Sequence, residues 1–338
     1  MVPNGPTLLA RGLRKMGQSA AFRRNPAEDF CLVHHGQLGY VPRPGFRGFG
    51  APRWLVTIDA DGLRSCGDTP DMSGDGAILA VGDSYTFGEG VSDTESWPAQ
   101  LQRLSGRRVL NGGVSGYGLD QIVLRAGQLA NAHRPSIIVV GFIADDIRRT
   151  EMRRLWGRDK PWFTIEGDEL VLKGAPVPRR KGLLPLQARR WAEKVLNALP
   201  ASLQHLFGYH LRAQPAGCGQ AIARYLVRRL MRLQSETQSR VVLMAQYHPH
   251  VWIDKAFAAG QRRITRDILE TAASNGIATV DTFQRFAAEP APQKFYVASH
   301  MNARGNLSVA SLLAATLPLL VKGNMAAARM DGDRSRSP

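Results

Sequence analysis

The sequence contains little of what defines several common classes of protein. Its 338 residues include three cysteines, Cys31, Cys66 and Cys218, which are too few and too widely spaced for a disulfide framework or a zinc site. Its continuous apolar runs are far shorter than the roughly 18 residues that a membrane-spanning helix needs. No apolar block follows the basic first 25 residues, as it would in a secretory signal. These absences predict a cytoplasmic protein that does not span a membrane.

Acidic residues are also scarce: 28 Asp and Glu stand against 44 Lys and Arg, which gives a net charge of +16. A strongly basic surface attracts anions, including nucleic acid and acidic polymers. The basic clusters are dispersed along the chain, however, and no nucleic-acid-binding motif accompanies them. We therefore interpret the charge as a solvated, arginine-rich surface and expect no specific binding of nucleic acid.

The distribution of apolar and turn-forming residues divides the chain into parts. We predict a basic, mobile N-terminus over residues 1–27, an N-terminal extended segment over 28–75, a main domain over 76–321 and a disordered tail over 322–338. Within the main domain, about residues 147–215 break the pattern with prolines and paired arginines. We interpret this stretch as an insertion over the carboxyl edge of a sheet, with a hairpin formed by Trp162–Ile165 and Leu170–Leu172.

Five short apolar runs in the main domain are bounded by turn-forming or polar residues. They are Ala77–Gly82, Arg108–Asn111, Ser136–Phe142, Arg240–Ala245 and Ala278–Val280. The longer ones are nearly continuous, as in strands that are buried on both faces of a parallel sheet. Helical patterns lie between or after them, at Thr94–Leu104, Leu119–Ala132, Ala216–Ser235, Lys255–Asn275 and Ala303–Leu320. This alternation predicts a doubly wound, flavodoxin-like α/β fold of three layers, with a five-stranded parallel sheet in the order 2-1-3-4-5 and the insertion between strands three and four.

In an open α/β sheet, ligands bind beyond the carboxyl ends of the strands, so the loops after the apolar runs are the first places to look for chemistry. Ser84 follows the first run in Gly82-Asp83-Ser84. A serine there is a nucleophile if a base lies near, and otherwise it caps a turn or helix. After the second run, the glycines of Asn111–Gly116 leave backbone N–H groups free to bind an oxyanion, or form only a tight turn.

Polar side chains also follow the later runs. Asp145 and Asp146 come after the third run, where they can make a polar contact, bind a metal or cap a helix. His300 precedes the last helix and can act as a base at the sheet edge, or serve a structural role. His248 and His250 follow the fourth run. Without further ligands nearby, we expect them to line a pocket or the surface rather than bind a metal.

Together these loops resemble the sequence blocks of the SGNH, or GDSL-type, hydrolase superfamily, and the stretch before them resembles a bacterial GDSL-like esterase subgroup. The resemblance covers about residues 37–320. It implies that Ser84 is the nucleophile, that the N–H of Gly116 helps to form the oxyanion hole and that His300 is the base. It implies neither a cofactor nor a metal.

The chain departs from the pattern of this superfamily at two positions. Asp145 stands where the family usually has an asparagine that donates into the oxyanion hole, and a carboxylate cannot donate unless it is protonated. Val297 and Ala298 stand where an aspartate usually precedes the histidine. A backbone carbonyl or another acid, such as Asp281, would therefore have to orient His300.

The resemblance implies a serine ester hydrolase acting on a short acyl ester, such as the acetyl ester of a glycan or a small molecule. Two alternatives remain: transfer of the acetyl group to a glycan hydroxyl, and a catalytically weakened protein that binds a carbohydrate or an acidic polymer. Trp156, Trp162 and Trp191 in the insertion are expected to pack in the core, and stacking on sugar rings is the alternative for them.

Overall fold

The computed structural model describes residues 31–50, 53–68, 76–179, 186–197 and 211–334. The N-terminus predicted to be mobile, residues 1–27, lies outside the described residues. The parts discussed below are the N-terminal segment (31–68), the main domain and the insertion (147–215, as far as it is described).

A five-stranded parallel sheet forms the centre of the main domain. Its strands are β5 (Ile78–Val81), β6 (Val109–Asn111), β7 (Ile137–Phe142), β12 (Arg240–Ala245) and β13 (Ala278–Asp281). They lie side by side in the order β13-β12-β7-β5-β6. Numbered by their position in the chain, this is the predicted order 2-1-3-4-5, which is confirmed. Because the strands are parallel, the loops after β5, β6 and β7 lie at the same edge of the sheet. The strand order reverses between β5 and β7, the point at which such sheets bind ligands.

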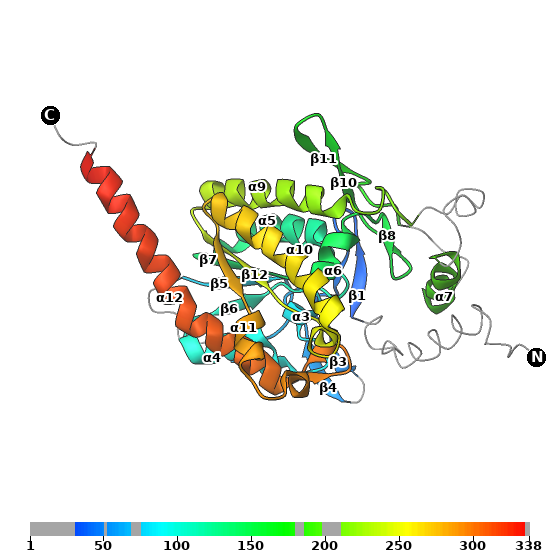
Figure 1. Ribbon diagram of the computed structural model, residues 1–338. Helices are drawn as coiled ribbons and strands as arrows, with labels where there is room; N and C mark the ends of the chain where they lie inside the picture. Colours follow the sequence, from blue (N-terminus) through cyan, green and yellow to red (C-terminus); the bar gives the residue numbers. More distant parts are fainter. Residues whose placement is uncertain (1–30, 51–52, 69–75, 180–185, 198–210, 335–338) are drawn as a thin grey trace, which may run out of the picture.

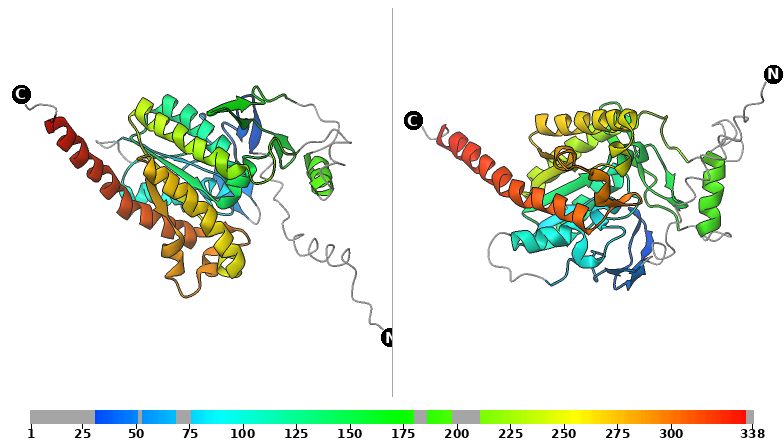
Figure 2. Two further views of the ribbon diagram at one scale, coloured as in Figure 1. Left: turned by 45° about the horizontal axis from the view of Figure 1, so that its top comes forward. Right: turned by 60° about the horizontal axis from the view of Figure 1, so that its bottom comes forward.

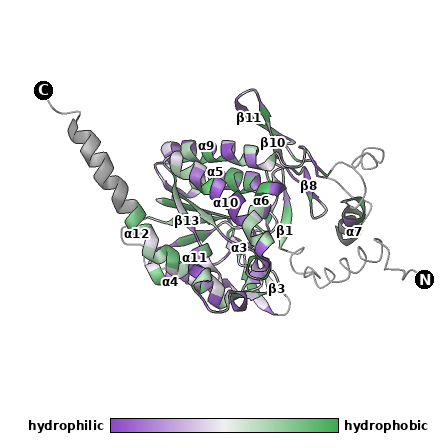
Figure 3. Ribbon diagram, in the orientation of Figure 1, coloured by the Kyte–Doolittle hydropathy of each residue, from purple (hydrophilic) through white to green (hydrophobic). Residues whose placement is uncertain are grey.

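Helices cover both faces of the sheet and complete the predicted three layers (Figure 1). One face carries α5 (Leu119–His133), α9 (Gly219–Thr237) and α10 (Lys255–Ser274), and the other carries α4 (Trp97–Ser105), α11 (Phe283–Ala287) and α12 (Ala303–Arg334). Successive strand residues point to opposite faces. Thus Leu79 packs with the first set of helices, whereas Ile78 packs with the second. Figure 3 shows that the helices on both faces of the sheet carry hydrophobic as well as hydrophilic residues.

Helix α12 is longer than the sequence pattern indicated. The apolar pattern ends at Leu320, and a disordered tail was predicted from residue 322, whereas the helix continues to Arg334 and extends away from the sheet (Figure 2). The added residues include Ala, Met and Arg, which favour a helix once the buried part has nucleated it. By length and composition, Ala303–Leu320 could also cross a membrane. Its inner face, including Val309 and Leu313, is instead buried against α4.

The N-terminal segment forms two antiparallel hairpins, drawn in blue in Figure 1: β1 (Leu32–His35) with β2 (Gly39–Pro42), and β3 (Arg47–Gly50) with β4 (Trp54–Thr57). Leu38, Tyr40, Val56 and Ile58 from this segment are buried in the same apolar cluster as α5. The segment is therefore part of the core rather than a separate unit.

The insertion begins within α6 (Ala144–Arg149), which follows β7, and ends before α9. It contains β8 (Arg154–Leu155), β9 (Arg158–Asp159), β10 (Trp162–Glu166), β11 (Glu169–Lys173) and α7 (Leu186–Asn197). The predicted hairpin is present as β10 and β11. Lys160 forms a buried ion pair with Asp120 of α5 and also donates to the carbonyl oxygen of Met152, 3.0 Å away. This contact ties the insertion to the main domain.

Candidate active site

The loop after β5 turns sharply into the short helix α3 (Ser84–Phe87). Asp83 caps that helix, since its Oδ1 accepts a hydrogen bond of 2.9 Å from the backbone N–H of Tyr85. Gly82 is needed at the turn, because a Cβ there would lie 2.1 Å from Thr86 Oγ1 and 2.8 Å from the carbonyl oxygen of Gly141. The turn holds Ser84 at the carboxyl end of β5.

The structure brings Ser84 and His300 together. His300 lies in the two-residue strand β15 (His300–Met301), which pairs with β14 (Tyr296–Val297). Its Nε2 is 2.9 Å from Ser84 Oγ, although the two residues are 216 positions apart in the chain. The hydroxyl of Tyr85 donates to the carbonyl oxygen of Ser299 at 2.6 Å, and its ring packs beside the imidazole. These contacts hold the imidazole over the serine.

Within the described residues, the N–H groups of Ser84 and Gly116 donate to no other protein group. Gly116 has a φ of +84°, in the left-handed region that favours glycine. The preceding glycines are ordered by Asn111, whose Oδ1 accepts from the N–H of Gly113 at 3.1 Å. These are the two N–H groups for which the sequence analysis predicted a role in the oxyanion hole.

Trp156 covers Gly116. A Cβ built on this glycine would lie 2.8 Å from Trp156 Cδ1 and 3.2 Å from the hydroxyl of Tyr40. Trp156 and Gly157 form the turn between β8 and β9, with φ values of +56° and +76°. A two-residue turn of this kind prefers Asn-Gly, so a tryptophan at its first position is conformationally costly. Trp156 is only partly buried and lies at the site rather than deep in the core.

Asp145, for which the sequence analysis predicted the position of the usual amide donor, is held by two guanidinium groups. Its carboxylate accepts from Arg148 Nε at 2.8 Å and from Arg149 Nε at 3.0 Å. Burial raises the pKa of Asp145, but the positive charges of Arg149 and Arg148 outweigh that effect and bring the pKa to about 2. The side chain is therefore ionised at neutral pH and offers only acceptors.

Arg149 connects the loop after β7 to the loop that carries the serine, a role that sequence reasoning missed. It pairs with Asp146 Oδ1 at 2.6 Å and with Asp83 Oδ2 at 3.4 Å, and donates to the carbonyl oxygen of Tyr117 at 2.8 Å. Burial alone would lower the pKa of Arg149, but Asp145, Asp146 and Asp83 raise it overall. Its spacing of four residues from Asp145 was the available signal, because side chains four apart meet on a helix.

The acid expected beside His300 is not Asp281. That side chain is exposed and accepts from the N–H of Phe283 at 2.9 Å. His300 Nδ1 lies 3.2 Å from Ser299 Oγ and 3.8 Å from Glu89 Oε1 instead. Glu89 is buried and was missed by sequence reasoning, although it stands five residues after Ser84 between two glycines.

His248 lies close enough to the site to respond to its charge. Burial, and then the positive charge of His300, lower the pKa of His248 to about 4, so it is neutral at neutral pH. Its Nδ1 accepts from the N–H of His250 at 3.2 Å. Among the described residues, no group of three or more His, Cys, Asp or Glu side chains is placed to hold a metal ion.

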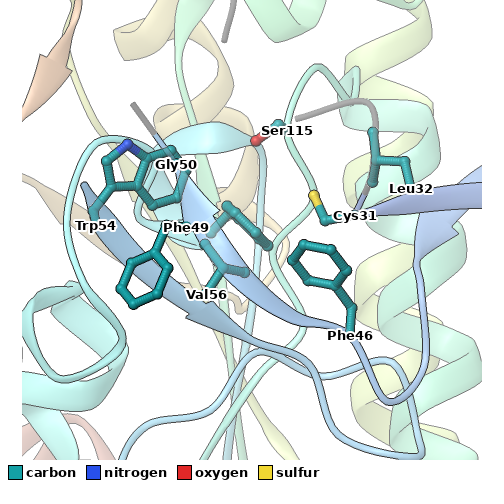
Figure 4. Close-up of a pocket in the computed structure, with 9 residues that line it drawn as sticks. Cys31, Leu32, Phe46, Phe49, Gly50, Trp54, Val56 and Ser115 are labelled. Atoms are coloured by element: carbon teal, nitrogen blue, oxygen red, sulfur yellow. The ribbon is translucent and has the colours of Figure 1, made fainter. Parts of the chain in front are cut away.

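A small apolar pocket lies between the N-terminal segment and the loop that carries Gly116 (Figure 4). Phe46, Phe49, Trp54 and Val56 from the N-terminal segment line it, and the hydroxyl of Ser115 points toward its edge.

Of the other two tryptophans in the insertion, Trp162 stacks against Arg153 and Trp191 is 69% exposed, so the core packing predicted for Trp191 was wrong.

The chain belongs to the GDSL-like lipase/acylhydrolase family, whose model matches residues 80–307. That range runs from β5 to the start of α12 and includes all four loops in which site residues were predicted. No sequence among the curated proteins matches the chain.

Several solved structures are similar at low sequence identity. An α/β hydrolase from the metagenome of Lake Arreo is 14% identical, with a TM-score of 0.47, over 74% of this chain and 98% of that one. A lipase/acylhydrolase from Enterococcus faecalis is 15% identical, with a TM-score of 0.41, over 71% and 94%. A catalytic mutant of an acetylxylan esterase from Geobacillus stearothermophilus is 14% identical, with a TM-score of 0.41, over 72% and 94%.

Proposed function

We propose that this protein is a serine ester hydrolase in which Ser84 is the nucleophile and His300 the general base. The observation that carries the proposal is the distance of 2.9 Å between His300 Nε2 and Ser84 Oγ, which lies within the range for direct proton transfer. Membership of a family of lipases and acylhydrolases supports the same class of reaction.

Acylation begins when His300 Nε2 takes the proton of Ser84 and Oγ attacks the carbonyl carbon of the ester. A new C–O bond forms, and the carbonyl electron pair moves to the oxygen. The N–H groups of Ser84 and Gly116 bind this oxyanion. When the tetrahedral intermediate collapses, the alcohol leaves with the proton from His300, and the acyl group stays on Ser84.

Deacylation repeats these steps with water. His300 takes a proton from water as the water oxygen attacks the acyl carbon. The tetrahedral intermediate then collapses, His300 returns the proton to Ser84 Oγ, and the carboxylic acid leaves. Asp145 adds no third donor to the oxyanion hole, and loss of one donor typically lowers the rate by about 10²–10³-fold. We therefore expect a slow esterase.

A short acyl group suits the space beside Gly116. Trp156 and Tyr40 both lie against this glycine, which supports a small group such as acetyl over a long chain. The alcohol part of the ester is proposed to be a glycan or a small molecule.

The first test is labelling with a fluorophosphonate probe, which reacts with activated serines. The wild-type protein is expected to be labelled and to hydrolyse an aryl acetate, whereas Ser84→Ala and His300→Ala should lose both properties and still fold. Ser235→Ala, at an exposed position of α9, is a matched control for labelling, since the probe should still react with Ser84. A wild-type protein without labelling or turnover would favour a binding function.

Hydrolysis and transfer give different products. With an added sugar acceptor, a hydrolase releases free acetate and leaves the sugar unmodified. Acetylated sugar as the main product would instead establish the transferase alternative.

A further inference from the structure

We infer that Glu89 is the positioning residue for His300, taking the place of the aspartate that this chain lacks before its histidine. The inference rests on the proposed function, since it assigns a partner to the proposed base. Val297, at one of the positions where that acid would stand, is 68% exposed, and Ala298 has a φ of +53° in a turn. An acid that orients His300 therefore has to come from another part of the chain.

Glu89 faces the nitrogen of His300 that is turned away from the serine. Its Oε1 is 3.8 Å from Nδ1, while Nε2 contacts Ser84 Oγ. The Glu89 side chain is 8% exposed, and that of His300 17%. Solvent therefore screens the interaction between the carboxylate and the imidazole only weakly.

A tight turn returns Glu89 to the serine. Helix α3 ends at Gly88, which has a φ of +85°, and the N–H groups of Gly88 and Glu89 both donate to the carbonyl oxygen of Ser84 at 3.0 Å. A side chain at position 88 would strike Ser96, since a Cβ there lies 2.5 Å from Ser96 Cβ. The backbone of the nucleophile therefore holds the residue that carries the acid.

Arg64 of the N-terminal segment clamps the same turn from the other side. Its Nη1 donates to the carbonyl oxygens of Phe87 and Gly88 at 2.7 and 2.6 Å, and its Nη2 to that of Val91 at 2.6 Å. The guanidinium is fully buried and pairs with Asp93 through Nε at 3.1 Å. The carboxylate of Glu89 thus projects from a segment that is fixed before any substrate binds.

A distance of 3.8 Å is longer than the roughly 2.7–2.9 Å of a charge-assisted hydrogen bond. In the resting site, Ser299 Oγ at 3.2 Å is the nearer partner of Nδ1. When His300 takes the serine proton, the imidazolium gains a full positive charge and the attraction to Glu89 increases. The Nδ1 proton stays on the ring and none passes to Glu89, so the carboxylate orients the ring and stabilises its charged form.

The test is the pH profile of kcat/KM for the wild type and Glu89→Gln, from about pH 5 to 9. Loss of the acid in a serine hydrolase triad costs about 10⁴-fold in rate, and we expect about 10²-fold here because the contact is longer. The fall on the acidic side should also move to lower pH, since removing a negative charge disfavours the imidazolium. Asp83, Tyr85 and His248 also face His300 and are unchanged in the variant.

Three further variants complete the design. Asp281→Asn, the matched acid-to-amide control, is expected to keep the wild-type rate and profile. Ser299→Ala should leave the fall of kcat/KM at low pH where it is in the wild type, because the negative charge of Glu89 remains. If Glu89→Gln does not fold, Glu89→Asp is the test instead. Its shorter side chain should lower kcat severalfold, and the fall of kcat/KM at low pH should stay at the same pH.

The outcomes separate this inference from the proposed function. A wild-type protein that neither reacts with a fluorophosphonate nor hydrolyses esters overturns both. A reactive wild type with a folded Glu89→Gln of equal rate and profile overturns the role of Glu89 alone, as does a folded Glu89→Asp with wild-type kcat. A large loss in Ser299→Ala but not in Glu89→Gln assigns the orientation of His300 to Ser299 instead.

Discussion

The N-terminal segment and the insertion both lie against the candidate active site, but they are attached to the main domain by different interactions. The N-terminal segment uses directed hydrogen bonds to backbone carbonyls, as Arg64 does at Phe87, Gly88 and Val91. The main domain makes a hydrogen bond of the same type to the N-terminal segment: Arg125 donates to the carbonyl oxygen of Gly62 at 2.8 Å.

The insertion is attached to the main domain by carboxylates. Lys160 of the insertion pairs with Asp120 of α5, and Glu151 Oε1 accepts from the N–H of Gly219 at 3.0 Å. Arg212 pairs with Glu151 within the insertion. Hydrogen bonds from a planar guanidinium constrain direction as well as distance, whereas an ammonium is close to a point charge. The comparison indicates that the N-terminal segment sets the precise geometry of the loop behind Ser84, and that the insertion positions a cover over Gly116.

The largest effect is expected when the clamp of the N-terminal segment is removed. Arg64→Met leaves the buried Asp93 without its charge partner and several carbonyl oxygens without the guanidinium donor, and breaking a buried ion pair costs about 3–5 kcal/mol. We expect the free energy of unfolding to fall by about that amount in urea titrations, with a further loss of kcat from the disordered turn. Arg47→Met, on an exposed strand of the same segment, is the control and should change stability by less than about 0.5 kcal/mol. An Arg64→Met protein with wild-type stability would show that the carbonyl contacts do not hold the turn.

The corresponding change in the insertion is Lys160→Met. It leaves the carboxylate of Asp120 buried without its partner, at a cost of about 3 kcal/mol. Adding Asp120→Asn removes the unpaired charge, so the double variant should regain part of the stability lost in the single one. Thermal and urea unfolding of the two single variants and the double variant measure this coupling. Equal stability of the single and double variants would mean that the ion pair is not what ties the insertion to α5.

The cover over Gly116 can be tested by Gly116→Ala. The added Cβ meets Trp156 at 2.8 Å, and the φ of +84° is unfavourable for alanine, so we expect a loss of about 1–3 kcal/mol in stability and a fall in kcat. Trp156→Asn is its companion, because asparagine suits the turn and uncovers the glycine. In the Trp156→Asn background, Gly116→Ala should cost less, since only the backbone strain remains. If Gly116→Ala lowers stability equally in both backgrounds, Trp156 does not contact the added methyl group.

The smallest effect is expected for Asp145→Asn. A pKa of about 2, below the usual range of about 3.9, means that the ionised Asp145 stabilises the fold above about pH 4 and that this contribution is lost as the pH falls through about 2. Because the side chain is 37% exposed, the stabilisation should stay below about 1 kcal/mol. Melting temperatures of the two proteins should therefore differ slightly at neutral pH and converge near pH 2.

The same variant tests the oxyanion hole. Asparagine adds N–H donors at this position, so kcat/KM should rise or stay unchanged at neutral pH. A fall of about tenfold or more with unchanged thermal stability would instead place Asp145 among the groups that orient the catalytic machinery.

Much of the fold could be predicted because its signals are local. The five buried strands appear as apolar runs in the sequence, and the order of the strands follows from the right-handed crossovers of an alternating pattern. The positions of Ser84, Gly116 and His300 were also predictable, because each stands in a loop beside a recognisable element. Such residues meet at the sheet edge whenever the fold forms.

The tertiary structure alone decided which groups support these three. Glu89 is one acid among 28 acidic residues, and only the turn at Gly88 and the clamp by Arg64 bring it beside His300. Trp156 looked like a core residue in sequence, and its place over Gly116 depends on a hairpin anchored by Lys160 about 40 residues from its partner Asp120. The sequence by itself determined the sheet and the loops, since periodicity and turn residues act over a few positions. The partners of the histidine and of the oxyanion loop were decided by contacts between distant segments, which no local pattern encodes.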